Sequence, residues 1–141
     1  MSTGPHTGHC ACGAVRFKTR GELRGVIFCH CTQCRRQTGH FLASTACEDV
    51  DLEVEGVENL SWFQSSPEAK RGFCKICGSG LFWKNSEKSY TSILAGSFDE
   101  PSGLKGEKHI FVADKGSYYE INDDLSGHDT APVGLVSTVK K

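Results

Sequence analysis

Seven of the eight cysteines of this 141-residue chain fall into three short clusters, and their spacing constrains the fold more than any other feature. The central cluster holds three thiols within six residues, and each flanking cluster holds a pair. The clusters are Cys10-x-Cys12, Cys29-x-Cys31-x-x-Cys34 and Cys74-x-x-Cys77. Because Zn²⁺ is bound tetrahedrally by closely spaced thiolates, we predict two zinc ions per chain. The two flanking pairs would form one site, called the outer site, and the central cluster would form the other, called the inner site.

The outer site combines the first and third clusters, because neither pair completes a site alone. Together they supply the four thiolates of Cys10, Cys12, Cys74 and Cys77. Gly78 permits a tight backbone turn behind the second pair. A zinc closed by four protein ligands is structural, and here it would tie the N-terminal part of the chain to its middle. The alternative is four reduced cysteines that are buried as small apolar residues.

The inner site differs because Cys29, Cys31 and Cys34 supply only three ligands. Three protein ligands with a fourth position for water or substrate are the pattern of a catalytic zinc. Such a site suits a thiol substrate, since zinc lowers the pKa of a thiol and binds the thiolate. Two alternatives remain open. Cys47 or His30 could close the site and make it structural; otherwise His30 forms a wall of the substrate pocket and Cys47 is a buried cysteine.

Two cations, Arg35 and Arg36, follow the last inner ligand. Residues 32–38 are predicted to form a short helix, with Thr32 as its N-cap and Gly39 as its C-terminal stop. Adjacent side chains on a helix point about 100° apart, so at most one arginine faces the pocket. There it would bind a carboxylate of the substrate. The alternative is that both arginines lie on a solvated helix face.

The rest of the chain predicts a mainly β domain with little helix. Residues 14–20 and 50–55 alternate apolar and polar side chains, which is typical of half-buried strands. Further short strands are expected at residues 26–28, 41–46, 60–64, 81–83, 90–95 and 109–113. The zinc-binding β domain is expected over residues 8–125. Residues 1–7 are expected to fray and residues 126–141 to form a loose tail, in which 133–139 could add an edge strand.

Charge and hydropathy exclude several classes of protein. Lys and Arg total 16 against 17 Asp and Glu, so the chain lacks the basic surface of a nucleic-acid binder. No apolar run approaches the roughly 20 residues of a membrane span, and the N-terminus does not resemble a signal peptide. We therefore expect a cytoplasmic protein, where disulfides are rare. The alternative is that the eight cysteines form four disulfides, since eight is an even number. A disulfide across Cys-x-Cys would be strained, however.

Four ordered segments resemble the glutathione-dependent formaldehyde-activating enzyme family, which also includes centromere protein V. The segments are Gly8–Phe17 (GHCACGAVRF), Cys29–Arg36 (CHCTQCRR), Arg71–Phe82 (RGFCKICGSGLF) and His109–Lys115 (HIFVADK). The resemblance covers about residues 8–125. It implies small antiparallel β-sheets organised around zinc, with the outer cysteines holding the structural ion and the inner cysteines the catalytic ion.

The activity implied by the resemblance is that of a carbon–sulfur lyase. The family joins formaldehyde and glutathione reversibly as S-hydroxymethylglutathione, so the expected partners are a small thiol and an aldehyde. Two other classes of function remain: a non-catalytic zinc module that binds protein partners, and a zinc carrier that passes the metal on through its exposed trio of thiols. Activity with a thiol and an aldehyde would distinguish the lyase from both.

Overall fold

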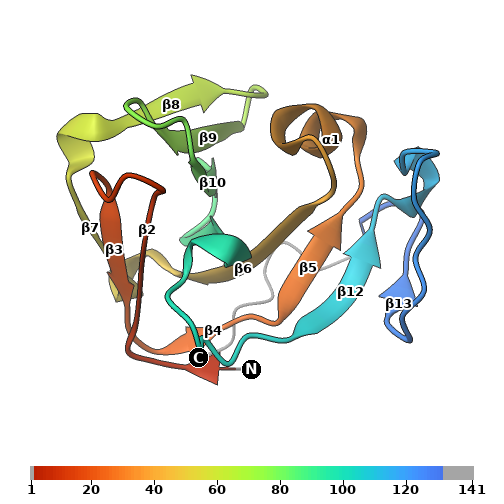
Figure 1. The fold of residues 1–141 in the computed structure, drawn as a ribbon, viewed down its shortest axis with the longest axis horizontal. Coiled ribbons are helices and arrows are strands. Elements are labelled where there is room, and N and C mark those ends of the chain that lie inside the picture. Colours follow the sequence, from red (N-terminus) through yellow and green to blue (C-terminus); the bar gives the residue numbers. More distant parts are fainter. Residues whose placement is uncertain (1, 132–141) are drawn as a thin grey trace.

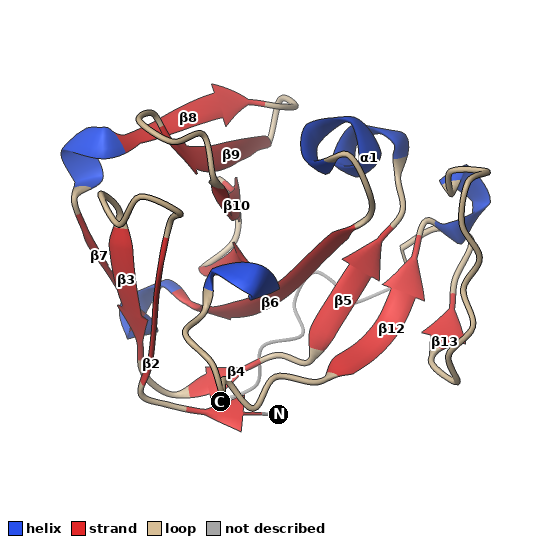
Figure 2. Ribbon diagram, in the orientation of Figure 1, coloured by secondary structure: helices blue, strands red, loops and turns tan. Residues whose placement is uncertain are grey.

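The computed structural model describes residues 2–131 and confirms a mainly β fold with little helix (Figures 1 and 2). Within that range, the single α-helix is α1 (Thr32–Thr38), and four 3₁₀ turns are η1 (Asp49–Asp51), η2 (Val57–Asn59), η3 (Ala95–Ser97) and η4 (Val112–Asp114). The strands are β1 (Ser2–Thr3), β2 (His6–His9), β3 (Arg16–Thr19), β4 (Glu22–Leu23), β5 (Val26–Cys29), β6 (Leu42–Glu48), β7 (Leu52–Glu55), β8 (Leu60–Gln64), β9 (Ala69–Cys74), β10 (Gly80–Asn85), β11 (Tyr90–Leu94), β12 (Gly106–Ile110) and β13 (Ser126–Gly127).

The strands form one large sheet and two small ones. The large sheet has the order β13-β12-β5-β6-β11-β10-β9-β8, and the small sheets are β2-β3-β7 and β1-β4. Pairing is antiparallel except that β12 runs parallel to both β5 and β13. Figure 1 shows β5 and β12 side by side, with α1 at the end of β5. This arrangement brings residues near 110 beside the inner cysteine cluster.

Most predicted strands are confirmed. In β3 the side chains of Phe17 and Thr19 are buried, whereas those of Arg16 and Lys18 are exposed, as the alternation predicts. The strands β5, β6, β8, β10 and β11 correspond to the other predicted strands up to residue 95. Gly39 ends α1 in a left-handed conformation, as expected of a helix stop.

Two predicted strands have different bounds. The strand expected over 50–55 begins only at Leu52, because η1 occupies its start and leaves Val50 76% exposed. The strand expected over 109–113 instead runs from Gly106 to Ile110. It ends there because Phe111 adopts a left-handed conformation with φ 54°, which no strand continues, and η4 follows.

The ends of the described chain take part in sheets. Residues 1–7 were expected to fray, yet β1 pairs with β4 and β2 pairs with β3. In the expected C-terminal tail, β13 pairs with β12, while residues 133–139 lie outside the described residues. The domain bounds of 8 and 125 therefore remain a prediction.

The main core lies between the small sheet β2-β3-β7 and the large sheet. Phe17 makes edge-to-face contacts with Phe82 and Phe98, at centroid distances of 5.8 and 5.1 Å. The same buried cluster includes Cys10 and Cys74. Two outer cysteines are thus part of the core, so the conformation of the outer site and the packing of the core depend on each other.

We expect Gly56→Ala to destabilise the protein by about 2–5 kcal/mol, because two costs add at this residue. Gly56 has φ 78°, and a Cβ there would lie 2.0 Å from the carbonyl oxygen of Ala14. Gly39→Ala is a matched control, since Gly39 has φ 82° but no atom within 4 Å of a Cβ. It should cost only about 1–2 kcal/mol for the left-handed conformation. Urea unfolding measures both, and equal losses would contradict the steric argument.

Candidate functional site

The outer cluster has the geometry of a closed metal site. The sulfur atoms of Cys10, Cys12, Cys74 and Cys77 all lie within 4.8 Å of one another. The Cys12 sulfur is 3.7 Å from that of Cys10 and 3.8 Å from that of Cys74. A tetrahedron with metal–sulfur bonds of about 2.3 Å has edges of about 3.8 Å, so these residues fit a four-coordinate zinc.

Two similar turns hold the outer sulfurs. The N–H of Gly13 donates to the carbonyl of Cys10 at 3.1 Å, and the N–H of Gly78 donates to that of Cys74 at 2.8 Å. Both glycines have φ close to 80°, a conformation that favours glycine. Each pair of cysteines is therefore bent toward one point by a glycine that closes the turn.

Hydrogen bonds reach three of the four outer sulfurs. The N–H of Val15 donates to the Cys10 sulfur at 3.3 Å, and the N–H of Cys77 donates to the Cys74 sulfur at 3.5 Å. The Ser79 hydroxyl, 3.2 Å from the Cys77 sulfur, lowers the pKa of Cys77 to about 5. Because metal binding requires deprotonated thiols, these contacts favour a bound cation.

The inner cluster lies where β5 meets α1. The sulfur atoms of Cys29, Cys31 and Cys34 lie within 4.8 Å of one another. Cys31 is the N-cap of α1, and its sulfur accepts a hydrogen bond from the N–H of Cys34 at 3.3 Å. The prediction of Thr32 as the N-cap is therefore wrong by one residue, because a thiol performs the capping.

The three inner thiols share negative charge unequally. Hydrogen bonds from Cys29 and then Cys34 lower the pKa of Cys31 to about 2, and the same interaction raises the pKa of Cys29. A guanidinium balances this charge, since Nη2 of Arg71 lies 3.6 Å from the Cys34 sulfur and 3.2 Å from Oε1 of Gln33. The cluster is thus suited to hold a cation beside a buried arginine.

Among residues 2–131, no fourth ligand joins the inner trio. Cys47 lies fully buried in the main core, where it pairs with Thr91 across β6 and β11. His30 is 1% exposed, and both of its ring nitrogens contact other side chains, Nε2 with His109 at 2.8 Å and Nδ1 with Tyr119 at 2.5 Å. The cluster therefore offers a metal three protein ligands.

The two arginines after the trio lie in different surroundings. Arg36 is exposed, whereas Arg35 is half-buried beside the loop that contains Gly116. The Nε of Arg35 is buried and has no hydrogen-bond partner within the described residues. Of these two arginines in the described chain, Arg35 is therefore the one with a buried donor left for a ligand or a water molecule, as Arg71 also has at its Nε.

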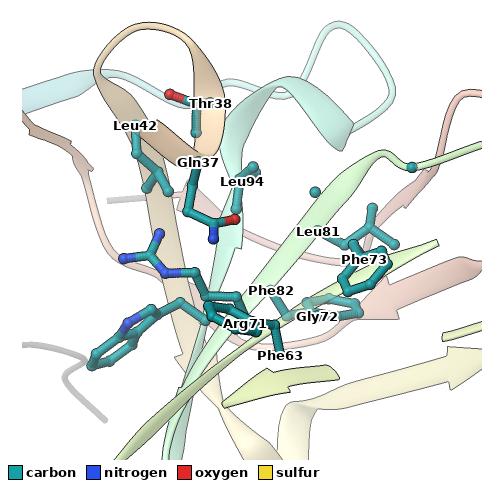
Figure 3. A pocket seen from close by; sticks show the side chains of 13 residues that line it. Gln37, Thr38, Leu42, Phe63, Arg71, Gly72, Phe73, Leu81, Phe82 and Leu94 are labelled. Atoms are coloured by element: carbon teal, nitrogen blue, oxygen red, sulfur yellow. The ribbon is translucent and has the colours of Figure 1, made fainter. Parts of the chain in front are cut away.

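A pocket of about 420 Å³ is lined by Arg71, whose Nη2 lies 3.6 Å from the Cys34 sulfur, and by none of the inner cysteines. Figure 3 shows Arg71 extending from its strand toward Gln37 and Leu42, which form the opposite wall. The remaining lining is mostly apolar and consists of Thr38, Phe63, Gly72, Phe73, Gly78, Gly80, Leu81, Phe82, Trp83 and Leu94. Sequence reasoning missed Arg71 because 37 residues separate it from Cys34.

Sequence reasoning also missed three side chains near His30: His109, Tyr119 and Asp123. His109 reaches this region because β12 runs parallel to β5, a pairing that no local pattern indicates, and Tyr119 and Asp123 come from the segment that follows β12. The available signal was His109 itself, which opens the fourth segment of the family resemblance.

Two further findings concern disulfides and membrane-spanning helices in the described part of the chain. All eight cysteines lie within residues 2–131, and none forms a disulfide. No helix in that range is long and apolar enough to cross a membrane.

The fold and the two clusters define a small β protein with one closed and one open thiol site, both of which could hold metal ions. The profile described as glutathione-dependent formaldehyde-activating enzyme matches residues 5–114. The chain belongs to this family.

Two relatives and a solved structure are similar to this chain over most of its length. The chain is 28% identical over 123 residues to an uncharacterized lyase of Schizosaccharomyces pombe, covering 86% of this chain and 88% of the relative. It is 28% identical over 127 residues to a Halomonas elongata protein provisionally named a glutathione-dependent formaldehyde-activating enzyme, covering 81% and 79%. A crystal structure of a Rhodobacter sphaeroides protein superposes with a TM-score of 0.58 at 26% identity, covering 69% of this chain and 91% of that one.

Proposed function

We propose that this protein is a zinc-dependent carbon–sulfur lyase that forms and breaks the adduct of a thiol and an aldehyde. The observation that carries this proposal is the inner trio, which offers a metal three ligands where the outer cluster offers four. The family description names glutathione and formaldehyde, and one relative is named a lyase, so S-hydroxymethylglutathione is the proposed substrate. We also propose zinc for both clusters.

In the lyase direction, the hydroxyl of the adduct gives its proton to solvent water, its oxygen forms the carbonyl bond, and the carbon–sulfur bond breaks with its electron pair leaving on sulfur. Cys29, Cys31 and Cys34 would hold a zinc ion, which when bound stabilises a thiolate as its fourth ligand. Arg71 places a positive charge beside Cys34 and lines the adjoining pocket. That pocket is large enough to take the body of the thiol and to position its sulfur near the trio.

The proposed reaction is tested by exchange NMR on glutathione mixed with formaldehyde. Thiols add to formaldehyde without help, so the measured quantity is the increase in exchange rate over the protein-free mixture. We expect the zinc-loaded protein to increase it. An unchanged rate at millimolar glutathione would contradict the glutathione assignment, and zinc release from the inner site without any exchange would indicate a carrier.

We expect Arg35→Ala to weaken glutathione binding by roughly 1.5–3 kcal/mol, the contribution of a hydrogen bond to a charged group. Arg35 is half-buried and retains a donor without a partner in the described chain, whereas Arg36 is exposed. Arg36→Ala is therefore the matched control and should change binding by less than about 0.5 kcal/mol. Calorimetric titration measures both variants, with zinc content checked in each. Equal losses in the two variants would contradict a specific role for Arg35.

A further inference from the structure

Arg71 is a buried cation that faces a pocket without an acidic partner. It lies in β9 and is 8% exposed. Within residues 2–131 both of its side-chain hydrogen bonds come from Nη2, which donates to Oε1 of Gln33 and to the Cys34 sulfur. In the same range its buried Nε has no partner, and no carboxylate forms an ion pair with it. Because an unpaired buried charge is costly, these surroundings favour an anion beside Arg71.

The other buried arginine of the described chain, Arg24, has its donors satisfied. Its Nε donates to the carbonyl of Gly25 at 3.3 Å, and its Nη2 donates to the carbonyl and hydroxyl oxygens of Ser44 at 3.0 and 3.3 Å. An arginine that only stabilises the fold is thus completed by oxygen atoms of the chain itself. Arg71 has no such partner at its Nε, so a group from outside the chain completes its surroundings.

The pocket beside Arg71 suits a negatively charged group of a ligand. Arg71 is the one charged side chain among the described residues that line it, and most of the other lining residues are apolar. Figure 3 shows its side chain extending across the pocket toward Gln37 and Leu42. A water molecule would need further polar partners, which apolar walls supply poorly. The same walls exclude solvent and so strengthen a hydrogen bond between the guanidinium and an anion.

The pocket and the inner trio are linked through α1 and Arg71. Gln37 and Thr38 line the pocket, and they lie on α1 one helical turn beyond Cys34. The Thr38 hydroxyl donates to the Cys34 carbonyl at 2.9 Å, which ties the two turns together. A ligand whose sulfur reaches the trio can therefore place another part of its body beside Arg71.

We propose that Arg71 binds a carboxylate of the thiol substrate and restricts the protein to thiols that carry one. This inference deepens the proposed lyase function and rests on it. The carboxylate accepts the hydrogen of Nε, while Nη2 keeps its contacts with Gln33 and Cys34. Glutathione has two carboxylates and belongs to this class of thiols. Cysteamine and 2-mercaptoethanol have none and are poor substrates.

Two probes of nearly equal shape test the preference for a carboxylate. 3-Phenylpropanoate and 3-phenylpropanamide share an apolar body, and one ends in a carboxylate where the other ends in a neutral amide. We expect the zinc-loaded protein to bind the carboxylate at least about tenfold more tightly, within the range of a hydrogen bond to a charged group. Arg71→Met should abolish this preference. Arg36→Met is the matched control, because it removes the same charge from an exposed position of α1. Equal binding of both probes by the wild type, or a preference that survives Arg71→Met, would overturn the proposal.

Proton–nitrogen NMR of the Arg71 Nε–H tests the contact in the wild type, independently of how any variant folds. We expect millimolar 3-phenylpropanoate to shift this resonance and 3-phenylpropanamide to leave it in place. An unshifted resonance with the carboxylate would count against the proposal as strongly as equal binding. Exchange NMR on glutathione and formaldehyde distinguishes this inference from the proposed function. Exchange without carboxylate binding contradicts the role of Arg71 alone, whereas carboxylate binding without exchange contradicts the lyase and leaves a carboxylate site.

Discussion

Replacement of Cys77 with serine is expected to leave most of the protein unfolded at ambient temperature and to remove the outer zinc, so that bound zinc falls from two ions per chain to one or fewer. Binding of a structural zinc contributes on the order of 10 kcal/mol to folding in small zinc domains. That is comparable with the total stability of a typical domain, about 5–15 kcal/mol. The outer sulfurs of Cys10 and Cys74 are also part of the main core, so loss of the ion loosens the packing around them.

Metal analysis and thermal unfolding followed by circular dichroism measure this outcome. Cys47→Ser is the matched control, because Cys47 is buried in the same core but belongs to neither cluster. This variant should keep both zinc ions. Its free energy of unfolding should fall by about 1–3 kcal/mol, because a hydroxyl group is then buried in the core. A Cys77→Ser protein that melts like the wild type and holds two ions would contradict a structural outer site.

The features that were predictable from the sequence are those that depend on neighbouring residues. Alternation around Phe17 predicted both the strand and its buried face, because side chains of a strand point to opposite sides in turn. The short helix was predictable from its stop at Gly39, which adopts a positive φ. The spacing of Cys74 and Cys77 similarly predicted that their sulfurs turn toward one point.

The features that were not predictable depend on contacts between distant parts of the chain. His30 and His109 meet although 79 residues separate them, because β5 and β12 pair in parallel. Alternation predicts a strand but does not say which strand lies beside it. The left-handed conformation of Phe111 was likewise not predictable from the sequence, because a bulky residue rarely adopts it.

The second large effect is expected from Cys31→Ser. This variant should fold normally but lose at least about 100-fold in exchange activity. Mutation of a residue that only supports a metal ligand already costs about 10–100-fold in metal affinity or activity, and Cys31 is itself a proposed ligand. Cys31 caps α1 through its sulfur, and serine is itself a preferred N-cap, so the helix is retained. Its hydroxyl does not ionise as a thiol does, so the inner ion binds more weakly. The outer cluster is unchanged and continues to stabilise the core.

Cys31→Ala separates the cap from the ligand. Alanine removes both the helix cap and the metal ligand. The alanine variant should therefore lose as much exchange activity as Cys31→Ser and, in addition, about 1 kcal/mol of stability. Metal content, melting temperature and exchange rate are measured on the wild type and both variants. If Cys31→Ser lowers the melting temperature as much as Cys77→Ser does, the inner ion is structural and the lyase proposal loses its basis. If the serine variant keeps its stability and one ion but loses exchange, the two clusters have different roles, and the reaction depends on the open one.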